Sequence, residues 1–131
     1  MARRSITIPG FQHGQQPIPA ASLVGNILMT GGIHGLDPAT GKMAEAVEDQ
    51  ARIAFQHLAN ILAAAGGTFD DVVRMTFYVK APEARPAINV EWLKAFPDAA
   101  SRPARHTINY EQLPAGALFQ CDCFAVITGA C

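Results

Sequence analysis

Long apolar runs are missing from this sequence of 131 residues. No stretch approaches the roughly 20 consecutive apolar residues that a membrane-spanning helix requires. The first residues, MARRSITIPGF, place a proline and a glycine where a signal peptide needs an apolar run. The sequence therefore predicts neither a membrane partner nor a secretory signal.

Charged residues are also scarce, and their signs nearly cancel. Ten Lys and Arg stand against 11 Asp and Glu, which gives a formal net charge of -1. A protein that binds a phosphate backbone needs a basic surface. The composition therefore argues against nucleic acid as a partner.

Cysteine is limited to three residues, and two of them, Cys121 and Cys123, are separated by a single position. An odd number without framework spacing predicts no disulfide scaffold. Neither a CxxC pair nor spaced histidines complete a tetrahedral metal site, so we expect no metal. We expect both cysteines to be small core residues in a protein of the reducing cytoplasm.

What the sequence does have is apolar material, at 50% of residues. A chain of this length suits one compact domain and is too short for two. Internal repeats, linkers and low-complexity tracts are absent from the sequence. We therefore expect a single domain over residues 1–131, with enough apolar surface to associate with copies of itself.

Hydrophobic periodicity predicts an α+β fold. Apolar residues at helical spacing predict a first helix over 45–65, and a shorter pattern predicts a second helix with Ile88, Trp92, Leu93 and Phe96 facing inward. The predicted elements are helices over 45–65 and 86–96, and strands over 5–8, 27–33, 72–80, 105–110 and 118–127. Two helices can cover only one face of such a mixed sheet. The other face is still apolar and would be exposed in a monomer, so we expect the chain to form an oligomer through it.

Polar residues alternate on the last two predicted strands. Arg105 and Thr107 share one face of the first, and Gln120 and Asp122 share one face of the second. If these strands pair as a hairpin, the two sets become neighbours, and Arg105 is suited to bind a carboxylate with two parallel hydrogen bonds. The alternative is that Arg105 forms a structural ion pair with Asp122 across the hairpin.

Several motifs in order resemble the Rid family, also called the YjgF or L-PSP family. They cover roughly residues 18–126: Gly25-Asn26, Thr30-Gly31-Gly32, Asp37-Pro38-x-Thr40-Gly41, Ala64-Ala65-Gly66-Gly67, Thr76-x-Tyr78-Val79-Lys80, Asn89, Ser101-Arg102-Pro103-Ala104-Arg105, Leu113-Pro114 and Phe124-Ala125-Val126.

This resemblance implies a chorismate-mutase-like homotrimer with a cleft between each pair of subunits. It implies that Arg105 holds the carboxylate of an enamine or imine such as 2-aminoacrylate, assisted by backbone amides near Gly31 and Gly32. Asn89 could cap the second helix or face the cleft, and the resemblance favours the cleft. The hydroxyl of Thr107 is able to hydrogen-bond a ligand. In deaminating members water attacks the iminium carbon and ammonia leaves. No metal or organic cofactor is implied.

Four positions depart from the family pattern. A glutamate credited with ordering the water is Gln120 here, a tyrosine is Ile18, a serine is Gly31, and a common cysteine is Thr107. Glutamine can hold a water by hydrogen bonding, but it cannot take a proton as a general base does.

Histidines could replace the missing base, because imidazole titrates near neutral pH. His34 follows a strand expected to line the cleft, and His13 lies in a segment whose path the sequence does not predict. His106 should point away from Arg105 by strand alternation, which favours a structural role. His57 is expected on the surface of the first helix.

Three functions remain. The leading hypothesis is a deaminase that hydrolyses 2-aminoacrylate-type intermediates to 2-oxo acids and ammonia, with Arg105 binding the substrate and Gln120 holding the water. The alternative is a non-catalytic protein that binds carboxylate metabolites, favoured by Gln120. Third is the endoribonuclease activity attached to some relatives, which the near-neutral charge opposes.

Overall fold

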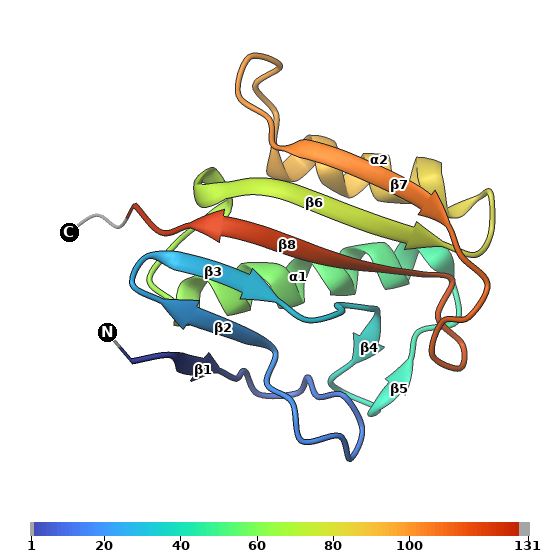
Figure 1. Cartoon of the computed structure of the whole chain (residues 1–131). Coiled ribbons are helices and arrows are strands. Elements are labelled where there is room, and N and C mark those ends of the chain that lie inside the picture. The colour runs from blue at the N-terminus through green and yellow to red at the C-terminus, as the bar shows by residue number, and fades with distance from the viewer. Residues whose placement is uncertain (1, 129–131) are drawn as a thin grey trace.

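The computed structural model describes residues 2–128 as a mixed β-sheet with two helices on one face (Figure 1). Its elements in chain order are β1 Arg4–Ile6, β2 Ala21–Val24, β3 Ile27–Thr30, β4 Leu36–Asp37, β5 Lys42–Met43, α1 Val47–Ala64, the 3-10 turn η1 Phe69–Asp71, β6 Val72–Val79, α2 Ala84–Ala95, β7 Ala104–Asn109 and β8 Phe119–Val126. Among these residues no helix is long and apolar enough to cross a membrane.

The main sheet has the strand order β1-β2-β3-β8-β6-β7. The pair β6–β7 is parallel and the other pairs are antiparallel. A parallel pair needs a crossover connection, and α2 supplies it between β6 and β7. Strands β4 and β5 form a separate small hairpin around the Asp37-Pro38-x-Thr40-Gly41 motif.

Helix α1 confirms the predicted helix over 45–65. Its apolar stripe, including Ala54, Leu58 and Ile61, is fully buried against the sheet. Glu48 and Asp49 lie in the first turn, where negative charge favours the helix N-terminus. The chain leaves the helix at Gly66, whose φ of 87° lies in the left-handed region that glycine tolerates.

A buried glutamine, Gln50, fastens α1 to two loops. Its Nε2 donates to the carbonyls of Ala44 and Gly116 at 2.7 and 2.9 Å, and its Oε1 accepts from the amide of Leu118 at 2.9 Å. A Cβ on Gly35 would collide with the backbone of Gln50. The side chain thus fixes the approach to β8, the strand that carries Gln120.

Two apolar side chains point outward where the sequence pattern places them inward. They are Leu93 of the second helix, and Val73, which alternation groups with Met75, Phe77 and Val79 on one face of the strand over 72–80. Val73 is 48% exposed, because a bulge between Val72 and Arg74 shifts the alternation of β6 by one residue. Leu93 is 52% exposed, whereas its neighbour Trp92 is buried as predicted. The expected strand over 27–33 ends at Thr30, after which Ile33 makes an isolated bridge to β8.

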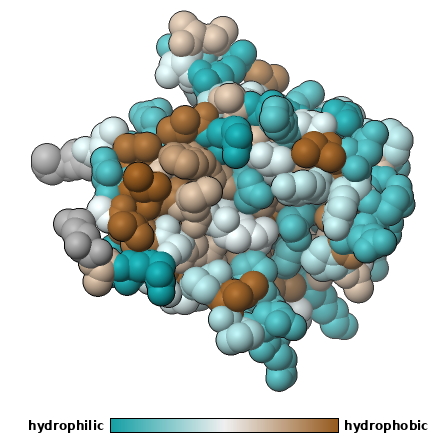
Figure 2. Space-filling view, in the orientation of Figure 1, coloured by the Kyte–Doolittle hydropathy of each residue, from teal (hydrophilic) through white to brown (hydrophobic). Residues whose placement is uncertain are grey.

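The face of the sheet away from the helices carries exposed apolar side chains. They gather toward one end of the sheet in Figure 2, and they include Val24, Ile27, Met29 and Val73, which are 46 to 51% exposed. Partly exposed Phe124 and Val126 of β8 pair with Met29 and Ile27 of β3 and extend the same surface. We call this surface the open sheet face.

Candidate functional site

Arg105 on β7 is held in a defined position on the helix side of the sheet. Its Nε donates to the Thr107 hydroxyl at 3.0 Å, and its Nη1 donates to Oδ1 of Asn89 on α2 at 2.7 Å. The guanidinium lies over the rings of Phe77 and Trp92, with Cζ 4.9 and 5.1 Å from their centroids. Stacking on aromatic faces restrains a guanidinium without neutralising it.

The charge of Arg105 is not compensated by a carboxylate within residues 2–128. The ion pairs in this part of the chain join Arg52 to Asp49 and Lys94 to Glu91. Burial, and then the nearby charge of Arg85, lower the pKa of Arg105 from its usual value. A guanidinium stays protonated in proteins, and its two hydrogen bonds here use only two of five N–H donors. It is therefore equipped to bind an anion.

Gln120 on β8 lies against the backbone of Gly32. A Cβ added to Gly32 would come within 2.6 Å of the Gln120 amide, so the glycine is what permits this contact. Gln120 borders a hollow of about 360 Å³, lined by Thr30, Gly31, Gly32, Tyr78, Tyr110, Gln120 and Asp122. Burial raises the pKa of Asp122 from its usual value, and the charge of Arg74 opposes this shift.

Arg105 and Gln120 do not meet within one chain, and the expected hairpin of the last two strands is wrong. Strand β6 lies between β7 and β8. In register, Arg105 and Cys123 both lie opposite Met75 on the helix side, whereas Tyr78 and Gln120 pair on the open sheet face. The alternative ion pair between Arg105 and Asp122 is wrong for the same reason.

The predicted residues instead form two groups. Arg105, Asn89 and Thr107 make the first, which we call the arginine group. Gln120, with Gly31 and Gly32, borders one hollow, and with Ile18, His13 and His34 it borders a second. We call these six the glutamine group.

Three histidines surround the ring of Phe11. The centroids of His13, His34 and His57 lie 5.2, 5.3 and 4.6 Å from that of Phe11. His13 Nε2 donates to the carbonyl of Gly32 at 2.7 Å, which brings the N-terminal segment against the glutamine group. The expectation that His57 lies on the surface is wrong, because it is 2% exposed and donates to the Leu36 carbonyl.

His34 is also buried, although a loop histidine is ordinarily solvated. Burial, and then the neighbouring His13 and His57, lower the pKa of His34 from 6.5 to about 4. Its Nδ1 is buried without a hydrogen-bond partner within the described chain. His34 is therefore neutral at neutral pH. His106 is exposed and opposite Thr76 in register, so it points away from Arg105 as predicted.

The prediction that Cys121 and Cys123 are small core residues is confirmed. Cys121 and Cys123 are buried, and burial raises the pKa of both thiols, that of Cys123 to about 12. The described residues include no group of three or more His, Cys, Asp or Glu side chains placed to hold a metal ion.

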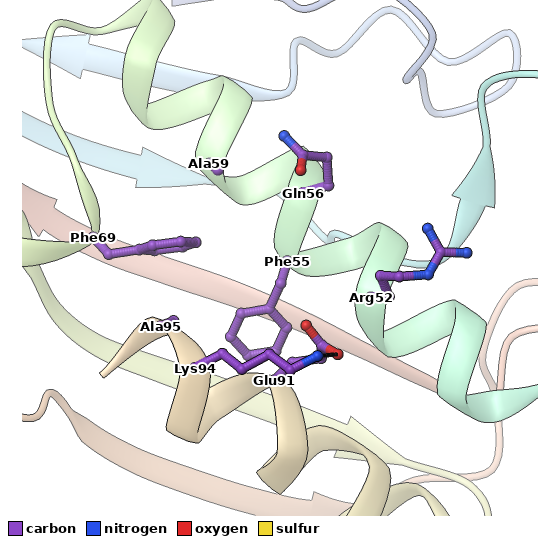
Figure 3. A pocket seen from close by; sticks show the side chains of 8 residues that line it. All are labelled: Arg52, Phe55, Gln56, Ala59, Phe69, Glu91, Lys94 and Ala95. Carbon is purple, nitrogen blue, oxygen red and sulfur yellow. Dashed lines mark hydrogen bonds and ion pairs between the residues drawn. The ribbon is translucent and has the colours of Figure 1, made fainter. Parts of the chain in front are cut away.

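A further depression lies between the two helices (Figure 3). It has a volume of about 190 Å³ and is lined by Arg52, Phe55, Gln56, Ala59, Phe69, Glu91, Lys94 and Ala95. The rings of Phe55 and Phe69 form its apolar part, and Lys94 pairs with Glu91 at its rim. None of the predicted site residues lines it.

The chain is similar to a known family along most of its length. A family model described as Endoribonuclease L-PSP matches residues 16–127. The chain is 32% identical over 112 residues to Reactive Intermediate Deaminase A, chloroplastic, of Arabidopsis thaliana, a match that covers 85% of this chain and 59% of that protein. It is 31% identical over 104 residues to the 2-iminobutanoate/2-iminopropanoate deaminase of Salmonella typhimurium, covering 79% and 81% of the two chains.

The fold has close counterparts among solved structures. A Yersinia pestis protein of the Rid family, of unknown function, superposes with a TM-score of 0.87 at 25% identity, covering 96% of this chain and 100% of that one. The likeness extends to the two helices on a mixed sheet, as the sequence predicted.

Proposed function

Because the chain belongs to the Rid, or L-PSP, family, we propose that it is an imine deaminase that hydrolyses 2-aminoacrylate-type intermediates to 2-oxo acids and ammonia. The observation that carries this proposal is the state of Arg105. Its guanidinium is fixed by Asn89 and Thr107, stacked on two rings and free of a carboxylate partner among residues 2–128. A substrate carboxylate supplies the missing charge.

The active site lies between copies of the chain, so that the arginine group of one copy faces the glutamine group of the next. The separation of the two groups by β6 supports this arrangement, because neither forms a complete site alone. The exposed apolar side chains of the open sheet face support association, since such patches mark interfaces. A homotrimer, with three such clefts, agrees with the family resemblance.

In the reaction, the enamine gains a proton at its terminal carbon and becomes the iminium form of the 2-imino acid. Water then adds to the iminium carbon, and one of its protons passes to nitrogen. The carbon–nitrogen bond breaks as the remaining hydroxyl proton is released to solvent, which gives ammonia and the 2-oxo acid. Gln120 orients the water by accepting a hydrogen bond at Oε1, and it takes no proton. Arg105 holds the carboxylate throughout. No metal or organic cofactor takes part.

A non-catalytic carboxylate-binding protein is the second candidate. The amide at Gln120, where a carboxylate would act as a general base, favours it. Endoribonuclease activity ranks third, because the net charge of -1 gives little attraction for a phosphate backbone. The cytoplasmic location also stays a prediction.

Ammonia release from enzymatically generated 2-aminoacrylate tests the proposal. We expect the parent protein to hydrolyse the imine well above the spontaneous rate. Arg105→Ala should lower the rate at least about a hundredfold, because a charged hydrogen bond contributes about 1.5 to 3 kcal/mol and Arg105 offers two. Arg52→Ala should not lower the rate. Arg52 is an exposed arginine of α1 and serves as the matched control. Gln120→Glu should raise the rate by adding a base.

Two outcomes would reject parts of this scheme. If no imine is hydrolysed faster by the protein while 2-oxo acids bind in an Arg105-dependent way, the binding protein replaces the enzyme. If light scattering gives a monomer that is nevertheless active, the site between copies is wrong. A charge among the exposed apolar side chains of the open sheet face, as in Ile27→Asp, should yield monomers and abolish activity.

A further inference from the structure

A second and larger hollow also borders Gln120. Its volume is about 490 Å³, and it is lined by Gln12, His13, Gly14, Gln16, Ile18, His34, Leu36, Gly41, Met43, Pro114 and Gln120. Gln120 also borders the smaller hollow that contains Gly31 and Gly32, so the two hollows adjoin at this side chain. We call the larger hollow the side pocket.

The side pocket is mostly apolar, and its lining carries no charge. The residues that line it include no Asp, Glu, Lys or Arg. Its polar groups are glutamine amides and the imidazoles of His13 and His34, and His34 is 5% exposed with an Nδ1 that has no hydrogen-bond partner within residues 2–128. A charged group placed here would lose its hydration without gaining a counter-charge.

The side pocket is also too large for the smallest imines. Ligand pockets of about 300 to 1,000 Å³ hold molecules of drug size. The single side-chain carbon of 2-aminoacrylate is comparable with a water molecule, whose share of liquid volume is about 30 Å³. It would leave nearly all of the space beside Gln120 unfilled.

Resting on the imine deaminase function proposed above, we propose that the side pocket receives the substrate side chain, and that the substrates are 2-imino acids with a large uncharged side chain, aromatic or branched aliphatic. Ile18, Leu36 and Met43 contact this side chain. The reaction that must supply such substrates is oxidation of the corresponding amino acid to its imine. Acidic and basic 2-imino acids are excluded.

Competition between hydrolysis and chemical trapping tests this substrate class. An amino-acid oxidase generates imines from alanine, leucine, phenylalanine and glutamate in the presence of semicarbazide, and a lower yield of semicarbazone reports faster hydrolysis. We expect kcat/KM for the phenylalanine and leucine imines to exceed that for the alanine imine at least tenfold, and the glutamate imine to be the poorest.

A substitution that narrows the side pocket should reverse the preference. Ile18 lines the pocket and is 54% exposed, so the larger side chain of Ile18→Trp should not prevent the chain from folding. It should lower kcat/KM for the phenylalanine imine at least tenfold more than for the alanine imine. Met43→Trp, which fills the pocket from β5, should do the same. Leu93→Trp, on the outer surface of α2 and 52% exposed, is the control and should leave the ratio unchanged.

Calorimetric binding of stable 2-oxo acids separates this inference from the deaminase function. If no imine is hydrolysed but phenylpyruvate binds more tightly than pyruvate, and Ile18→Trp removes the difference, the deaminase function fails and the side pocket stands. If imines are hydrolysed but those of alanine or glutamate react as fast as that of phenylalanine, the side pocket is overturned while the deaminase function stands.

Discussion

Mild acid should destabilise the protein through His34. The pKa of this buried histidine is lowered from 6.5 to about 4, chiefly by burial and then by His13 and His57. Between these two values the unfolded chain binds a proton that the folded chain does not, so the free energy of unfolding falls as pH falls. The full shift corresponds to about 3 kcal/mol, of which about 2 kcal/mol should be lost between about pH 7 and pH 5.

Two other groups alter the total without changing the test. The pKa of His57 is also lowered, by burial, so it adds to the loss in the same direction. The pKa of Asp122 is raised, so it binds its proton more readily in the folded state and opposes the loss at lower pH. Both contributions persist in a His34 variant, and the difference between variant and parent isolates His34.

Urea unfolding followed by the fluorescence of Trp92 measures the effect at fixed protomer concentration, because association also stabilises the folded state. His34→Leu should flatten the dependence on pH by about 2 kcal/mol between about pH 7 and pH 5. His106→Gln, which alters an exposed histidine, should leave the dependence as in the parent. An unchanged slope in His34→Leu, or greater stability in acid, would refute the burial argument.

Two further predictions concern the supports of Gln120. Gln50→Ala removes three buried hydrogen bonds and should lower the free energy of unfolding by about 2 to 4 kcal/mol. The control Gln56→Ala, on the exposed side of the same helix, should lower it by less than about 0.5 kcal/mol. Equal losses for the two variants in chemical denaturation would show that Gln50 does not fasten the loops. The added methyl group of Gly32→Ala must displace the flexible amide of Gln120. This variant should lower kcat about tenfold or more with little change in melting temperature. Full activity would show that the position of Gln120 does not matter for the reaction.

Local patterns in the sequence were sufficient for the elements that bury a regular stripe. The helix over 45–65 and the strand over 72–80 repeat their apolar residues at the period of their structure, and both are found within two residues of the predicted bounds. Val73 departs because a bulge, which depends on the partner strand, breaks the alternation. Strand β2 was missed, since its four residues are too few to show a period.

The arrangement of the candidate site was harder to predict, because it depends on contacts between distant segments. The identity of Arg105 and Gln120 came from motifs, but their separation follows from β6 lying between their strands. His34 and His57 are buried because Phe11, more than 20 residues earlier in the chain, packs against them. The hydrogen bond from Arg105 to Asn89 could be anticipated only from the family resemblance, which named both residues.

The two buried cysteines of β8 allow local opening of this strand to be detected chemically. Cys121 and Cys123 alternate along this strand with Gln120 and Asp122, so any fluctuation that exposes a thiol also lifts the site residues out of register. Only a thiolate reacts quickly with an alkylating reagent, and burial keeps both groups protonated. The rate at which a thiol reagent labels these two positions therefore measures how often β8 separates from its neighbouring strands. A bound substrate that stabilises this part of the sheet should lower the labelling rate.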